Sequence, residues 1–571
     1  MRHDRWYFPA LLGLGVVSFL CATLLSGHPL PQSVQEPELP PPGTVRITRT
    51  DRAPVDLRTI VPEPEKRPSS LHPYLERVIA QWQRGGAMYM LRGRGRTYGF
   101  RWMADRVLVR VIPQPRTAGH LRDALARIPD VRVHTAHPES LEVWVPIHRL
   151  EMLRTLPGVR QVTIPRWVRP MVTSEGYGIV GAPVWRDLPR LPGLEGTPRI
   201  GIVDIGFRGY TGLLGNELPP SSQVHTRNFR FDQDFESTEH GTAVAEIVAD
   251  FNRQVDLYLA AIATSGELAE AIAWMREQGV QVISGSIGIT VRAGNGCCSP
   301  EYPELDRAAR DGIVPVFAAG NEALSHWYAP DFADSDGDRW LNFSGRDELN
   351  CFPVLAGDTT DITLIWYDWP ATTRDYDLYV MTPGGRIVGA SLAAQTGQQE
   401  PFEYLSIQSD RDRTLCVAIR RFSGPTGVPV ELFIFSSACG GTTPCFEYTV
   451  PDYSIIEPAD GRNVVAVGAV VWNTDRLAPY SSRGPTLDGR LKPDISAPTH
   501  VRTVSYGSFL FTGTSAATPH VTGAISLMHY KVFTQFSGQT IYQILVPRSI
   551  DLGPKGPDRL YGVGRLYMLI R

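Results

Sequence analysis

The chain has 571 residues, of which 43% are apolar and 20% charged, a composition typical of globular proteins with room for about three or four domains. Its formal net charge is −3, so it lacks the excess of basic residues that nucleic-acid binding usually needs, and we expect no nucleic acid among its partners.

The N-terminus has the features of an exported protein. Arg2 and Arg5 precede a mostly apolar run from Phe8 to Leu25, and a positive flank before such a run is typical of export. The run is long for the apolar part of a signal peptide and short for a membrane span. Residues 1–27 are therefore expected to be either a cleaved signal peptide or a retained membrane anchor. Both alternatives predict a secreted or extracytoplasmic protein.

Residues 28–70 are rich in proline and read as an extended linker, because this composition cannot bury a core. The pattern changes in residues 104–165, where alternating apolar residues predict strands and amphipathic stretches predict helices. The strands are expected at 106–112, 131–135, 141–145 and 159–164, and the helices at 118–128 and 147–156. The order β-α-β-β-α-β is that of the ferredoxin-like α+β fold.

Strands and helices alternate from residue 176 onward, which predicts an α/β domain with a parallel sheet flanked by helices. Its strands are expected at 199–204, 280–286 and 313–319, with a helix at 268–278. Residues 323–457 break this rhythm with short strand-like runs between turns rich in Gly and Pro, which predicts a β-sandwich. The α/β pattern resumes over 458–571. We therefore expect an all-β sandwich inserted between the two halves, 176–322 and 458–571, of one α/β domain.

The cysteines predict disulfides, because six of the 7 lie outside the N-terminal segment and an even number in an exported chain favours pairing. They are Cys297, Cys298, Cys351, Cys416, Cys439 and Cys445. The short loop between Cys439 and Cys445 suggests one bridge. Cys297 and Cys298 are adjacent and are expected to pair with other partners. A metal site is the rival reading, but no Cys-x-x-Cys spacing accompanies these residues.

An acidic segment in the predicted insert has two interpretations. Asp334, Asp336 and Asp338 alternate around Gly337, and alternating carboxylates with a glycine suit an oxygen-ligated calcium loop. The distal Glu of an EF-hand is absent at the proper spacing. The alternative is a solvated acidic turn.

Three polar residues stand at positions that suit nucleophilic catalysis. Asp204 ends a predicted buried strand, His240 begins a predicted helix, and Ser515 follows Gly-Thr at the head of another helix. A serine hydroxyl needs a base within hydrogen-bond reach, and the base needs an orienting carboxylate. A helix N-terminus directs backbone N–H groups and its positive dipole end at a reacting carbonyl.

These segments resemble those of the subtilisin-type serine proteases, the subtilases. The similar stretches are Ile200-Gly-Ile-Val-Asp-Ile-Gly206, His240-Gly-Thr-Ala and Gly513-Thr-Ser-Ala-Ala-Thr-Pro-His-Val. Val316-Phe-Ala-Ala-Gly-Asn321 is similar to the family segment whose asparagine completes the oxyanion hole. Ile283-Ser-Gly-Ser-Ile-Gly288 is similar to the edge strand that pairs with the substrate backbone, which implies that Ser286 and Gly288 contact substrate.

The resemblance implies a function, and two departures from the family pattern leave that function intact. It implies a subtilisin-like endopeptidase that hydrolyses polypeptides through an acyl-enzyme and requires no cofactor. The 104–165 module resembles the inhibitory prodomains of this family, so we expect it to inhibit the enzyme within the same chain. Asp204 is followed by Ile-Gly instead of the commoner Thr-Gly, and Ser515 by Ala-Ala-Thr-Pro instead of Met-Ala-Ala-Pro. Neither departure removes a catalytic group.

Two alternative functions centre on the insert. The chain could be chiefly a cell-surface binding module, with an aromatic platform on the insert for a carbohydrate or a protein. It could also be a processing protease of narrow specificity in which the insert dominates recognition. The aromatic residues concerned are Trp366, Tyr367, Trp369, Tyr376 and Tyr379. Alternating aromatic residues in strands also suit a sandwich core.

Overall fold

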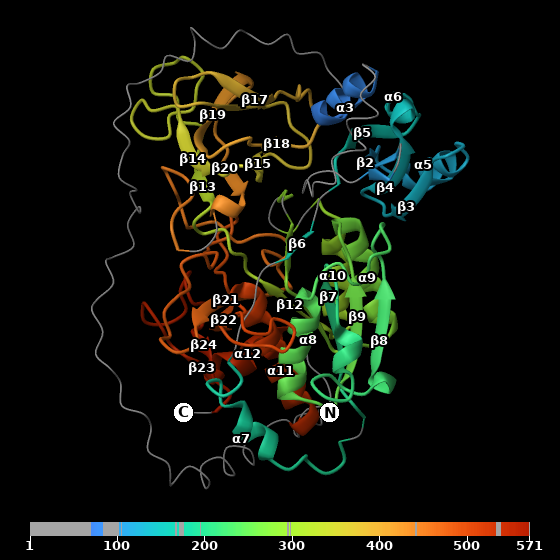
Figure 1. Cartoon of the computed structure of the whole chain (residues 1–571), viewed down its shortest axis with the longest axis vertical. Coiled ribbons are helices and arrows are strands. Elements are labelled where there is room, and N and C mark those ends of the chain that lie inside the picture. The colour runs from blue at the N-terminus through green and yellow to red at the C-terminus, as the bar shows by residue number, and fades with distance from the viewer. Residues whose placement is uncertain are drawn as a thin grey trace, which may run out of the picture.

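The computed structural model describes residues 70–83, 102–103, 106–165, 168–170, 176–194, 196–289, 291–293, 296, 298–439, 442–532 and 538–569. Figure 1 shows three bodies: a small α+β module and a β-sandwich lie side by side, and both face a larger α/β domain. The N-terminal apolar run, the proline-rich linker up to residue 69, Cys21 and Cys297 lie outside the described residues. Within the described residues, no helix is both long and apolar enough to cross a membrane.

The small module has the predicted ferredoxin-like fold. Its elements are β1 (Trp102–Met103), β2 (Arg106–Pro113), α5 (Ala118–Ala126), β3 (Arg132–Ala136), β4 (Leu141–Pro146), η1 (Ile147–Arg149), α6 (Leu150–Leu153) and β5 (Val159–Thr163). The strands lie in the order β5-β2-β4-β3, and all their pairings are antiparallel. This is the split β-α-β arrangement that the order of elements predicted.

The module's sheet has two buried faces. Alternate residues of β2, beginning with Val107 and Val109, pack against the helices of the module. Leu108 and Arg110 point to the opposite face and are 1% exposed. A helix that the sequence analysis missed, α3 (Pro73–Gln83), adds Leu75 and Val78 to the module's core. The proline-rich stretch before it gave no signal that the chain folds again at residue 71.

The α/β domain is built on a nine-stranded sheet in the order β23-β24-β22-β21-β12-β10-β7-β9-β8. The strands are β7 (Arg199–Asp204), β8 (Val224–Asn228), β9 (Asp256–Ala261), β10 (Val282–Gly285), β12 (Val314–Ala318), β21 (Val465–Val471), β22 (Ile495–Thr499), β23 (Ser549–Ile550) and β24 (Arg565–Leu566). All are parallel except β23, which pairs antiparallel with β24.

Helices cover both faces of this sheet. On one face α8 (His240–Phe251) and α11 (Thr514–Val532) share a core with the sheet, together with α7 (Ala182–Asp187) and α12 (Gly538–Leu545). On the other face α9 (Ser265–Glu277) and α10 (Glu301–Arg310) bury a second core. The predicted α/β domain, a parallel sheet flanked by helices, is therefore confirmed, and its two sequence halves form one continuous sheet.

The insert is an all-β sandwich, as predicted. One antiparallel sheet has the order β13-β20-β15-β18 and the other β14-β19-β16-β17. The strands are β13 (His326–Ala329), β14 (Asn350–Val354), β15 (Thr359–Trp366), β16 (Asp375–Met381), β17 (Ile387–Ser391), β18 (Phe402–Gln408), β19 (Arg413–Ser423) and β20 (Val430–Phe435). Of the two readings of the aromatic residues, burial within the sandwich is confirmed for Trp366, Tyr376 and Tyr379, which are at most 2% exposed.

Two disulfides lie within the insert. Cys439 and Cys445 form the bridge that the short loop suggested. Cys351 and Cys416 form another, because they lie directly opposite each other on β14 and β19. Cys298 is also disulfide-bonded. Because the other four described cysteines pair among themselves, none of them is the partner that we expected for Cys298.

Candidate active site

Asp204 and His240 meet at the carboxyl end of the sheet. Asp204 is the last residue of β7, and His240 is the first residue of α8. Nδ1 of His240 lies 2.8 Å from both carboxylate oxygens of Asp204, and both residues are at most 1% exposed. A Cβ on Gly241 would lie 2.7 Å from Cβ of Asp204, so glycine at this position lets the helix approach the strand closely. The carboxylate can thus hold the imidazole in one tautomer and orientation.

Ser515 lies at the start of α11, where Gly513 takes a backbone φ of 138° that other residues rarely adopt. Its Oγ donates a hydrogen bond to the backbone oxygen of Ser286 at 3.3 Å. Ser286 in turn donates its own hydroxyl to the backbone oxygen of Ser515 at 2.7 Å. These two contacts place the serine beside the end of β10, the strand next to β7.

The hydrogen bond expected between Ser515 and His240 is not among the contacts of this structure. Nε2 of His240 is buried and has no hydrogen-bond partner among the described residues. The ring of Phe511, four residues before Ser515, lies 6.3 Å from the ring of His240, so the two segments are neighbours. Catalytic hydrogen bonds often tighten only when substrate is bound.

Asn321 is fixed beside the same helix N-terminus. Its Oδ1 accepts hydrogen bonds from the backbone N–H of Thr514 at 2.9 Å and from the Thr514 hydroxyl at 3.0 Å. Because the amide oxygen is held in this way, the amino group of Asn321 is the part that can donate to a substrate. The orientation suits the oxyanion role that the sequence predicted.

The edge strand predicted to bind substrate is occupied by the chain itself. β11 (Ile287–Ile289) pairs antiparallel with β6 (Val168–Pro170), so that Pro170 lies opposite Ile287 and Arg169 opposite Gly288. β6 follows the ferredoxin-like module in sequence and runs toward Ser286. The backbone groups of Gly288 that were predicted to contact substrate are therefore used by the chain's own segment.

His520, which lies in the same helix as Ser515, has a structural role. Its Nδ1–H donates to the backbone oxygen of Ala516 at 2.6 Å, and its side chain is fully buried. Burial lowers the pKa of His520 to about 4, so this imidazole is neutral near physiological pH. Its ring packs edge-on against Phe251 of α8.

The acidic segment of the insert brings three carboxylates together. One oxygen atom from each of Asp334, Asp336 and Asp338 lies within 4.8 Å of the others. The Asp334 carboxylate also accepts backbone N–H groups from Gly337 and Arg339, which stabilises the turn without any ion. Calcium binding here stays a prediction, which thermal unfolding with and without a chelator would check.

Two contacts near the site were missed from the sequence. The hairpin that precedes Ser515 is anchored by Glu246 of α8, whose carboxylate accepts the backbone N–H groups of Val504 at 2.6 Å and Ser505 at 3.1 Å. α9 begins with a capping box in which Thr264 and Glu267 satisfy each other's backbone. The spacing Thr-x-x-Glu before an apolar run is a signal that could have located this second feature.

Comparison with known proteins agrees with this architecture. The model of the subtilase family (Peptidase S8) matches residues 198–340 and 384–564, which together make up more than half of the chain. The chain belongs to the subtilase family. Subtilases are serine proteases, which act on polypeptides. The matched residues include Asp204, His240, Asn321 and Ser515.

Similarity to individual relatives is limited. Pyrolysin of Pyrococcus furiosus is 43% identical over 58 residues, which are 9% of this chain and 4% of pyrolysin. The CspB protease of Clostridium perfringens is 15% identical, covers 65% of this chain and 93% of its own, and has a TM-score of 0.46. Fervidolysin from Fervidobacterium pennivorans is 14% identical, with 83% of this chain and 63% of its own covered and a TM-score of 0.41.

Proposed function

We propose that this subtilase is an exported serine endopeptidase in which Asp204, His240 and Ser515 form the catalytic triad. The observation that carries the proposal is the buried contact of 2.8 Å between Nδ1 of His240 and Asp204. It lies at the carboxyl end of the parallel strands, and Ser515 lies in the first turn of α11. A histidine held in this way presents Nε2 as a base. The basic residues and apolar run before Leu25 support export.

The mechanism follows from the position of each group. Ser515 Oγ attacks the scissile carbonyl while His240 takes its proton, and Asp204 stabilises the imidazolium that forms. The Asn321 amino group and the Ser515 backbone N–H donate to the oxyanion. His240 then gives its proton to the leaving amine, and a water activated by the same histidine hydrolyses the acyl-enzyme. No step requires a cofactor.

The ferredoxin-like module serves as an intramolecular inhibitor in this proposal. The support is the pairing of β6 with β11, because a substrate that used the backbone groups of Gly288 would have to displace Arg169. Asp204, His240 and Ser515 are also buried in the intact chain, with Ser515 0% exposed. The uncut chain is therefore a zymogen with a closed cleft.

Narrow processing specificity is the second candidate function, in which the insert limits what reaches the site. The observation that favours it is the buried contact between Arg292, three residues after β11, and Glu431 of the insert. A binding function without proteolysis loses its main support, because most of the aromatic residues proposed for it lie in the core.

Covalent labelling tests the assignment of the nucleophile. A fluorophosphonate reagent should modify the processed wild-type protein at Ser515 and leave Ser515→Ala unmodified, with peptide mapping to locate the adduct. His240→Ala should label far more slowly, because the serine loses its base. Labelling at another serine, or none in a protein that cleaves casein, would refute the triad.

A further inference from the structure

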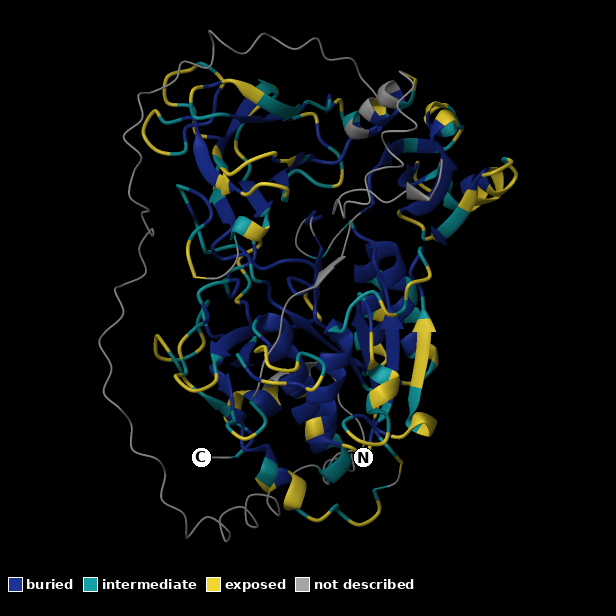
Figure 2. Cartoon of the chain, in the orientation of Figure 1, coloured by how far each residue is buried: buried dark blue, intermediate teal, exposed yellow. Residues whose placement is uncertain are grey.

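The outer face of the module's sheet carries charged residues that are buried. On β2 and β4 this face presents Leu108, Arg110, Glu142 and Trp144, each at most 2% exposed. The strands of the module are largely coloured as buried in Figure 2. An isolated ferredoxin-like module would leave such a face in water. Arginine and glutamate are seldom buried without partners, so this surface must be matched by other parts of the chain.

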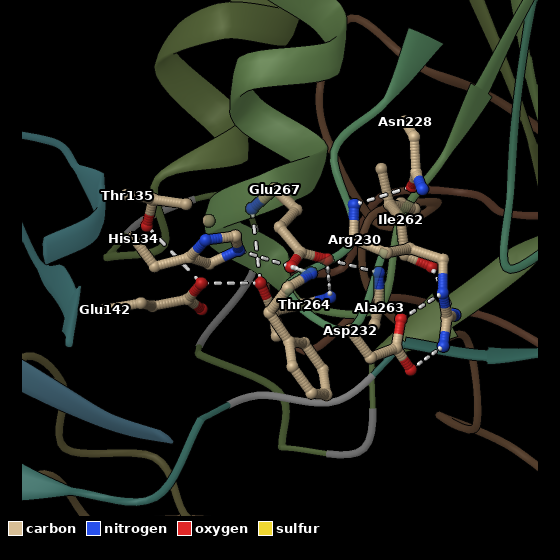
Figure 3. A network of polar contacts seen from close by, with 12 residues as sticks. His134, Thr135, Glu142, Asn228, Arg230, Asp232, Ile262, Ala263, Thr264 and Glu267 are labelled. Atoms are coloured by element: carbon tan, nitrogen blue, oxygen red, sulfur yellow. Dashed lines mark hydrogen bonds and ion pairs between the residues drawn. The ribbon is translucent and has the colours of Figure 1, made fainter. Parts of the chain in front are cut away.

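One part of this face docks on the α/β domain (Figure 3). The Glu142 carboxylate accepts a hydrogen bond of 2.6 Å from the hydroxyl of Thr264, the N-cap residue of α9. Nε2 of His134 lies 2.5 Å from a carboxylate oxygen of Glu267 in the first turn of that helix. Beside them, Leu108 and Trp144 form a small apolar cluster with Phe231 and Ala263.

Another part of the same face docks on the inserted sandwich. Nη1 of Arg110 lies 3.2 and 3.1 Å from the two carboxylate oxygens of Glu400. Both side chains are at most 3% exposed. The ring of His72, just before α3, stacks on Phe402 with ring centres 5.6 Å apart.

Apolar contacts join the same two bodies. The core of the module is continuous with Ile365, Phe402, Tyr404 and Phe433 of the sandwich. Burial of such surface supplies most of the affinity in stable interfaces. The ion pair adds specificity, because a buried charge that loses its partner is strongly unfavourable.

We propose that the inserted β-sandwich is a second docking surface for the N-terminal module, with residues 70–165 of this chain as its occupant. The module then binds between the sandwich and α9, with contacts to both. It stays bound as a separate polypeptide after the chain between β6 and Gly176 is cut, and it keeps the cleft closed until the sandwich releases it. The insert thereby sets when the protease becomes active.

The experiment uses the full chain with Ser515→Ala and a recognition sequence for a site-specific protease placed between β6 and Gly176. This protein is cut by the added protease, diluted, and followed by gel filtration over time. Because the cut does not depend on Ser515, a failure here is distinct from a failure of the proposed catalytic function. With the native interface we expect the module to co-elute with the remainder.

The Arg110 and Glu400 variants test the sandwich as the anchor. Arg110→Met or Glu400→Met should speed release at least about 30-fold, because each removes one member of the buried ion pair across the interface and leaves the other charge in place. The double variant should release the module almost as slowly as the parent protein, since neither charge of this pair remains. The matched control is Arg122→Met on α5, whose side chain is 57% exposed and pairs with Asp123 on the same helix. It should release the module at the parent rate.

Two results would overturn the proposal. One is immediate separation of the native module from the remainder after the cut. The other is release from Arg110→Met and Glu400→Met no faster than from Arg122→Met. Thermal unfolding of each uncut variant confirms that it is folded before the cut. Phe402→Ser is a second route that leaves the ion pair intact, and it should also speed release because the stacking on His72 is lost.

Discussion

Individual residues at the proposed catalytic site are held by hydrogen bonds to their neighbours. Oδ1 of Asn321 is fixed by two hydrogen bonds from Thr514, and Nδ1 of His240 by the two oxygens of Asp204. Pre-set geometry of this kind lowers the cost of reaching the transition state, because few groups must reorganise during the reaction. Ser515 differs, since its hydroxyl bonds to Ser286.

Asn321→Ala should lower kcat by about 10²–10³-fold and change KM little, because the lost donor binds the oxyanion and not the ground-state carbonyl. The measurement is steady-state hydrolysis of a peptide substrate by the processed enzyme. Asn463→Ala is the control, because that asparagine is exposed on the same domain and donates to Asp306. An equal loss in both variants would contradict the oxyanion role.

At the scale of elements, we expect the contact between β4 of the module and the start of α9 to depend on pH, because buried ionisable groups meet there. Burial, and next the negative charge of Glu267, raise the pKa of Glu142 to about 7. The facing groups are Thr264, Thr135, His134, Glu267 and Arg110. A carboxyl whose pKa is raised by docking favours the docked state at low pH, and that contribution is lost as the pH rises toward the raised pKa.

Neighbouring groups modify this dependence. The pKa of His134 is raised despite its burial, through its contact with Glu267, so its contribution is also lost as the pH rises. Burial raises the pKa of Glu270 as well, with the same sign. Burial lowers the pKa of His137, which donates to the backbone oxygen of Gly266, and this group acts in the opposite direction. Glu142, His134 and Glu270 favour docking at low pH, whereas His137 acts in the opposite direction. We therefore expect weaker docking at higher pH.

The module should therefore leave the cut protein at least about tenfold faster at pH 8 than at pH 5.5, since each pKa unit corresponds to a tenfold change in binding. Release would be timed by gel filtration at fixed ionic strength. Glu142→Gln should release the module at rates that depend less on pH, because its amide cannot ionise. Release that is equally fast at both pH values in the parent protein would contradict this expectation.

At the scale of the whole molecule, all three bodies meet at β11 and the residues just after it. β11 belongs to the α/β domain, pairs with the segment that follows the module, and is followed by Arg292, which contacts Glu431 of the sandwich. Because the sandwich joins β12 to β21 of the main sheet, it is tied to the catalytic domain at both of its ends. Its position is fixed by the fold and not by a flexible tether.

Maturation should depend on the protein's own serine. Mass spectrometry of secreted wild-type protein should find a mature N-terminus between Pro165 and Pro183, whereas Ser515→Ala should keep the module joined to the remainder. The reason is that β6 lies on the substrate strand and runs toward Ser515. The same cut in both proteins would mean that another protease performs it.

Local patterns in the sequence were sufficient for much of this protein. The spacing of apolar residues predicted the ferredoxin-like order, the α/β domain and the sandwich. The contexts of Asp204, His240, Asn321 and Ser515 led to the catalytic constellation that we propose. These signals are local because a helix start, a strand end or a tight Gly-Thr-Ser turn constrains the few residues beside it.

Only the tertiary structure decided which bodies touch and what covers the cleft. Arg110 and Glu400 are 290 residues apart, and nothing in the segment around either one indicates the other. The same holds for the pairing of Gly288 with Arg169 and for the contact between Glu142 and Thr264. Such contacts depend on the summed packing of three bodies, which no short segment encodes, and in our proposal they determine when the catalytic chemistry becomes available.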